Sequence, residues 1–135
     1  MKKTKLFFGK NKANNDRKPV VAGQFYSDNP IILKNNVINL FSKSEYKQIQ
    51  NITAVITPHA GFMYSGEVAA SAFKQIDENK KYKYIFIICT SHRMTFDGAA
   101  VYNSGDYITP LGKIEVDTEI ANKLIEKNPF FIVND

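Results

Sequence analysis

The chain has 135 residues, which is the length of one ordinary domain. Its hydrophobic content of 44%, with 13% aromatic residues, is typical of a protein with a buried core and excludes a disordered chain. Residues 1–18 hold seven of the 18 Lys and Arg and one of the 13 acids, so they carry +6, while the remainder carries −1. A nearly neutral remainder argues against nucleic-acid binding, which favours a basic face within the fold.

Neither a membrane span nor an export signal is predicted. The longest uncharged apolar run, Tyr84–Thr90, is far shorter than the roughly 20 residues of a membrane span. The apolar part of the basic N-terminus, Leu6–Phe8, is shorter than the about 7–15 residues of a signal-peptide core. The single cysteine, Cys89, excludes an internal disulfide and fits a reducing compartment. We therefore expect a soluble cytoplasmic protein.

The first half of the chain predicts a tail and then alternating elements. Residues 1–16, rich in Lys and Asn, are expected to form a flexible basic tail. Asp28 or Asn29 can cap a helix that has Pro30 near its first position. The expected elements are a helix from Pro30 to about Phe41, a strand at Ile52–Thr57, a helix that Ser65 could cap, and a strand at Tyr84–Thr90.

The second half continues the alternation. We expect a short strand at Ala99–Tyr102 and a turn at "TPLG". Asp117 caps a third helix that Pro129 ends, and Phe130–Val133 begins another strand. Such alternation is typical of an α/β fold, with a largely parallel central sheet between helices on both faces. Residues 17–135 are thus expected to belong to one α/β domain.

The chain's two histidines stand in equivalent places. His59 and His92 each lie just beyond the carboxyl end of an expected strand, 33 residues apart, which is about one strand–helix–strand unit. Sites in parallel sheets form at these strand ends. Because imidazole is a common ligand of zinc, iron and copper, the pair predicts a metal site, although a catalytic metal usually takes three protein ligands. Cys89 lies inside an apolar strand and is expected to be buried. A pair of structural histidines is the alternative.

Four sequence blocks resemble the Memo-like family (mediator of cell motility), whose bacterial and archaeal members are called AmmeMemoRadiSam system protein B. The blocks are "RKPVVAGQFYSDNP" (17–30), "ITPHAGFMYSGEVAASAF" (56–73), "IFIICTSHR" (85–93) and "YITPLGKIEVDTEIANKL" (107–124). Their order and spacing match the family along nearly the whole chain after the tail.

The resemblance implies a three-layer fold like that of the class III extradiol dioxygenases, which are non-haem iron enzymes. His59 and His92 match the two histidines that hold the metal in that comparison, which implies iron or copper. Phe25 falls where the family has an aromatic residue at the pocket wall. Tyr64, Ser91 and Arg93 are expected to line the same pocket.

This sequence departs from the family in two ways. The family usually has Gly-Pro-Ser-His at the second histidine, whereas this chain has Cys89-Thr90-Ser91-His92, which could change the turn that aims the imidazole. The family also runs to roughly twice this length, and its further pocket histidine and cysteine lie in the part without a counterpart here. The chain therefore resembles the N-terminal half of the domain, and an inactive isolated half is a third alternative beside the two functions that follow.

Two functions follow from the resemblance. The first is metal-dependent redox chemistry, of a dioxygenase-like kind, on a small-molecule ligand at bound iron or copper. The alternative is a binding module without chemistry that takes acidic or phosphorylated peptides, with Arg93 and His92 offering positive charge. AMMECR1-like and radical-SAM proteins are implied as functional neighbours.

Overall fold

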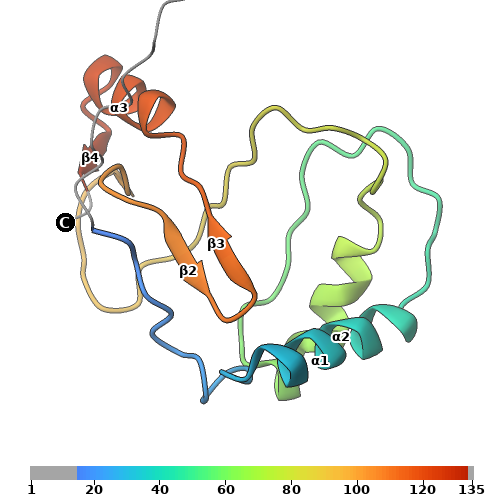
Figure 1. The fold of residues 1–135 in the computed structure, drawn as a ribbon. Coiled ribbons are helices and arrows are strands. Elements are labelled where there is room, and N and C mark those ends of the chain that lie inside the picture. Colours follow the sequence, from blue (N-terminus) through green and yellow to red (C-terminus); the bar gives the residue numbers. More distant parts are fainter. Residues whose placement is uncertain (1–14, 134–135) are drawn as a thin grey trace, which may run out of the picture. The chain divides into compact units, whose positions relative to one another are not determined.

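The computed structural model describes residues 15–133 (Figure 1). The expected flexible tail falls almost wholly on residues 1–14, which lie outside the described residues. The elements are α1 (Pro30–Ser42), α2 (Phe62–Phe73), β1 (Ala99–Val101), β2 (Tyr107–Thr109), β3 (Gly112–Ile114), α3 (Thr118–Lys127) and β4 (Phe131–Val133). Across residues 15–133, no helix is long and apolar enough to cross a membrane.

The chain divides into two compact units, which we describe separately. The helical unit comprises Pro19–His92 with Pro110–Gly112 and contains α1 and α2. The strand unit comprises Arg93–Thr109, the described residues up to Lys18 and those from Lys113 onward. It contains β1, β2, α3, β4 and all of β3 except Gly112.

Helix α1 begins where its capping residues predict. The Asn29 side chain accepts hydrogen bonds from the amides of Ile31 and Ile32, and Pro30 occupies the first turn. Leu33 is buried, and α1 packs against α2. The two helices come close at Gly66, because a Cβ there would lie 3.0 Å from Cδ1 of Leu40.

Helix α2 begins earlier than its sequence predicted. Gly61 is its N-cap, and Ser65, the expected cap, lies inside the helix and donates from Oγ to the Ala60 carbonyl at 3.0 Å. The Phe62 amide donates instead to the Phe25 carbonyl at 2.8 Å. A capping side chain would accept a hydrogen bond from a free amide of the first turn. Here the Phe25 carbonyl accepts it, so α2 begins without a side-chain cap.

The two apolar strands predicted in the helical unit are not formed. Ile52–Thr57 and Tyr84–Thr90 have no regular structure, and Ile56 and Ile88 are 97% and 93% exposed. A β-prone segment becomes a strand only beside another backbone that completes its hydrogen bonds. No such neighbour lies beside these two segments within residues 15–133.

The strand unit confirms the α/β class. Strands β1 and β4 pair in parallel, with Ala99 opposite Phe131 and Val101 opposite Val133. Helix α3, capped by Asp117, precedes β4 and packs against it. A turn joins β2 and β3 into a second two-stranded sheet. The described residues therefore form two small sheets, and the expected single central sheet is not formed among them.

A cluster of charged side chains joins Asp16, near the first described residue of the strand unit, to Asp106 and Lys113. Lys113 Nζ lies 3.0 Å from a carboxylate oxygen of Asp16 and 3.0 Å from one of Asp106. The Asp106 amide donates to Asp16 at 3.0 Å, and its own carboxylate accepts from the Val116 amide at 3.0 Å. The Asp106 amide, followed by the Lys113 ammonium, holds the pKa of the Asp16 carboxyl below its usual 3.8.

We expect this cluster to stabilise the strand unit in a pH-dependent way. Because the folded-state pKa of Asp16 is the lower one, its contribution is complete above the unfolded pKa and is lost as the pH falls through the folded pKa. Asp16→Asn should therefore lower the melting temperature near neutral pH and flatten its fall below about pH 4. Thermal melts from pH 2 to 7 (roughly the range over which carboxylates titrate) test this against Glu126→Gln, an exposed control. Superimposable curves for Asp16→Asn and the parent would contradict it.

We also expect Gly98 to be essential for the β1–β4 pair. Gly98 has φ of +95°, and a Cβ there would overlap the Phe130 carbonyl oxygen, which accepts the Ala99 amide at 2.8 Å. Gly98→Ala should destabilise the strand unit by more than about 3 kcal/mol. The matched control is Gly112→Ala, which also has positive φ, of +132°, but open space around the new Cβ, so about 1 kcal/mol is expected. Denaturant unfolding of both variants measures the difference, and equal losses would contradict a steric role for Gly98.

Candidate functional site

The structure brings the two histidines together within the helical unit. His59 Nε2 and His92 Nε2 are 3.2 Å apart, and both residues are exposed. The ring centroids are 5.1 Å apart at an interplanar angle of 53°, so the imidazoles meet edge to edge and are not stacked. Two groups that can each bind a metal or a proton thus face one another from loops 33 residues apart.

The loop that carries His59 is braced by the turn around Phe25. Gly61 approaches that turn so closely that a Cβ would lie 3.2 Å from the Phe25 carbonyl oxygen. The hydrogen bond from the Phe62 amide to the same oxygen joins the two segments. The Phe25 amide donates to the Val21 carbonyl at 2.9 Å, which closes the turn. The "AGQFY" and "PHAG" blocks therefore fold as one local structure.

A cavity of about 260 Å³ opens beside His59, and its lining is mostly apolar. Phe25 lies in its wall, where the sequence placed an aromatic residue. Tyr64 is 83% exposed and is not among the lining residues. The cavity is lined by Val21, Phe25, Tyr26, Pro58, His59, Ala60, Phe62, Ser65, Gly66, Ala69 and Phe73.

Sequence reasoning missed Val21, Tyr26 and Phe62 as cavity residues. Val21 and Tyr26 belong to the block at residues 17–30, and Phe62 belongs to the block at residues 56–73. The rings of Tyr26 and Phe62 are in contact, with centroids 5.8 Å apart. The two apolar runs in "VVAGQFY", on either side of Gly23 and Gln24, were a usable signal for a wall of this kind. Ser91 and Arg93 are both exposed and do not line this cavity, and Arg93 belongs to the strand unit.

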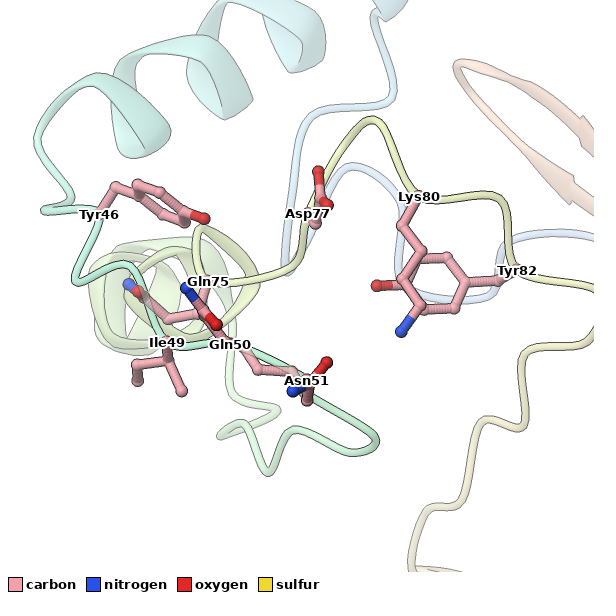
Figure 2. Close-up of a pocket in the computed structure, with 9 residues that line it drawn as sticks. Tyr46, Ile49, Gln50, Asn51, Gln75, Asp77, Lys80 and Tyr82 are labelled. Atoms are coloured by element: carbon pink, nitrogen blue, oxygen red, sulfur yellow. The ribbon is translucent and has the colours of Figure 1, made fainter.

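A second cavity, of about 350 Å³, is shown in Figure 2. Gln75 is buried in its wall, and all of its polar atoms are used. Its Oε1 accepts from the Lys47 amide at 2.8 Å, and its Nε2 donates to the carbonyls of Glu45 and Ser71. Across from it, Lys80 lies over the Tyr82 ring. This amide fixes the loop after α1 to α2, which is a structural role.

The donor atoms available for a metal are few in the described part of the chain. No group of three or more His, Cys, Asp or Glu side chains is gathered there, so the two imidazoles stand as a pair. Cys89 is exposed, and its expected burial was therefore wrong. The reason is that Tyr84–Thr90 has no covering layer on either face.

These observations define an α/β protein with a parallel strand pair and two facing imidazoles beside an apolar cavity. The model of the family described as "Memo-like protein" matches residues 17–135, and the chain belongs to this family.

Archaeal relatives support the same assignment. A MEMO1 family protein of Methanothermobacter thermautotrophicus is 33% identical over 119 residues, which cover 83% of this chain and 43% of that protein. One from Caldivirga maquilingensis is 38% identical over 119 residues, covering 82% and 42%, respectively. One from Methanobrevibacter smithii is 35% identical over 124 residues, covering 84% and 44%. The chain thus spans less than half the length of these relatives.

The short distance between the two imidazoles predicts that only one of the two Nε2 atoms carries a proton. At 3.2 Å, one Nε2 should donate a hydrogen bond and the other accept it, because two Nε2–H groups would repel. Ring ¹⁵N spectra of the metal-free protein should therefore show one protonated and one unprotonated Nε2. In His92→Ala, the Nε2 resonance of His59 should shift towards that of an ordinary tautomer mixture. Two identical Nε2 resonances that His92→Ala leaves unchanged would contradict the contact.

Proposed function

We propose that this chain gives a Memo-like protein a metal-binding pocket, in which His59 and His92 supply two ligands to a divalent ion. The observation that carries the proposal is the Nε2–Nε2 distance of 3.2 Å. With metal–nitrogen bonds of about 2.05 Å, that separation corresponds to a ligand–metal–ligand angle of roughly 103°. Such an angle lies between octahedral and tetrahedral values, so little rearrangement is needed to admit an ion.

The chemistry of the donor set fits two positions of a coordination sphere. The pair leaves room for a third protein ligand, which catalytic sites usually have, and for an open position. We infer that the third ligand lies outside the described residues, since no further metal-ligating group joins the pair within them. Each Nδ1 remains available to a hydrogen-bond acceptor that would fix its ring.

Iron or copper suits this proposal, because imidazole binds both and the expected extradiol-dioxygenase-like fold uses iron. When bound, either ion would supply redox chemistry. The chain's own contribution is the apolar wall beside His59, built from residues such as Phe25 and Phe62. That wall would exclude water and orient a flat, mostly apolar substrate next to the ion.

The peptide-binding alternative stays a prediction. Arg93, the cation that it invokes, is exposed and belongs to the strand unit. The apolar lining of the cavity beside His59 favours an aromatic ligand over a phosphate. The links to AMMECR1-like and radical-SAM proteins likewise stay predictions.

Metal titration tests the proposal. His59→Ala and His92→Ala should each weaken binding of Fe²⁺ or Cu²⁺ by about 100-fold or more, since each removes one of two imidazole ligands. Anaerobic calorimetry with Fe²⁺, and aerobic calorimetry with Cu²⁺, measure the loss. The control is Asp77→Asn, which removes a carboxylate from the cavity of Figure 2. Equal affinity in the parent and both histidine variants would overturn the proposal.

A further inference from the structure

The cavity of Figure 2 lies between two loops of the helical unit. One loop, residues 43–52, follows α1, and the other, residues 74–82, follows α2. None of the residues that line this cavity also lines the cavity beside His59. It is therefore a separate candidate site, which the proposed metal chemistry does not use.

The two loops are held in a fixed geometry. The buried Gln75 side chain accepts from the Lys47 amide at 2.8 Å and donates to the Glu45 carbonyl at 2.8 Å. Within the same loop, Gln48 and Asn51 have φ of +54° and +57°, in the left-handed region that residues other than glycine rarely adopt. Such a backbone persists only where the surrounding contacts hold it. The walls of the cavity are thus set before a ligand binds.

Side chains of opposite charge enter the cavity from a single turn. The Lys80 amide donates to the Asp77 carbonyl at 3.2 Å, which closes the turn. Oδ1 of Asp77 accepts from the Asn79 amide at 2.9 Å, so the carboxylate is oriented. Nζ of Lys80 lies 5.4 Å from the centroid of the Tyr82 ring. None of the ion pairs between described residues involves Asp77 or Lys80, so a carboxylate and an ammonium line one cavity without neutralising one another.

The remaining lining divides the cavity into a polar and an apolar side. Figure 2 shows Lys80 and Tyr82 on one side, and Tyr46 and Ile49 on the other. The Asn51 amide lies between them. The cavity volume of about 350 Å³ is within the range of small-molecule sites, which combine apolar surface with a few polar groups that orient the ligand.

We propose that this cavity binds a free α-amino acid with an apolar or aromatic side chain. The ammonium of Lys80 pairs with the ligand carboxylate, and the carboxylate of Asp77 pairs with the ligand ammonium, both as charge-assisted hydrogen bonds. The ligand side chain lies against Tyr46 and Ile49. A phosphate would be repelled by Asp77, and an uncharged sugar would leave both charges of the site without a partner.

Nuclear magnetic resonance titration of the 135-residue chain tests this inference. The probe is L-phenylalanine, which should shift the amide signals of Asn51 and Gln75 in a saturable way. Two related ligands remove one charge each. L-Phenylalaninamide lacks the carboxylate and N-acetyl-L-phenylalanine lacks the ammonium, so each should bind at least about five-fold more weakly than L-phenylalanine.

Variants of the turn assign each charge to its partner. Lys80→Gln and Asp77→Asn should each weaken binding of L-phenylalanine by at least about five-fold. Lys80→Gln should leave the affinity for L-phenylalaninamide unchanged, and Asp77→Asn should leave that for N-acetyl-L-phenylalanine unchanged, because each ligand already lacks the group concerned. The matched controls are Lys81→Gln and Glu78→Gln, at exposed neighbours outside the cavity, which should bind all three ligands as the parent does.

Three outcomes would overturn the inference. The first is the absence of saturable shifts at Asn51 and Gln75 up to the solubility limit of L-phenylalanine. The second is equal affinity of the parent chain for the three ligands, which needs no variant to be measured. The third is an equal loss of affinity in the control variants, which would assign the effect to net charge. None of these readouts involves a metal, His59 or His92, so the inference and the proposed function fail separately.

Discussion

One main-chain hydrogen bond, from the Phe62 amide to the Phe25 carbonyl, joins the two segments that form the His59 side of the candidate site. It supplies an acceptor to the first turn of α2, so the helix begins at Phe62 without a side-chain cap. Gly61 permits the contact, because a larger residue would press on the Phe25 backbone. His59 lies two residues before this point, so its position follows from the brace between the two loops.

Sequence patterns predicted the elements whose signals are local. Asn29, Asp117 and Pro129 marked helix ends correctly because a cap or a proline acts within one turn. Strands near Ala99 and Phe130 were also predicted, but their parallel pairing with one another was not. His59 and His92 were expected to meet at the ends of two neighbouring strands; they lie 3.2 Å apart, although those strands are not formed. Gly61 as a cap was missed, because its partner, the Phe25 carbonyl, is remote in sequence and carries no side-chain signal.

The predicted strands at Ile52–Thr57 and Tyr84–Thr90 failed for a different reason. Their composition is strand-like, but a strand is completed by a neighbour, and no element within the described residues supplies one. The exposure of Cys89 has the same cause. The apolar composition of these segments indicates that they require a neighbouring strand and a covering layer. Within the described residues, neither segment has a neighbouring strand, and Tyr84–Thr90 has no covering layer.

The loops that carry the two imidazoles also bear on how tightly the pair can bind an ion. Each histidine lies two residues after an apolar segment, Ile52–Thr57 or Tyr84–Thr90, whose backbone is not held by strand hydrogen bonds. Binding an ion must then fix both loops at an entropic cost. A two-imidazole pair held only by loops is therefore expected to bind metal more weakly than the same pair at the ends of completed strands.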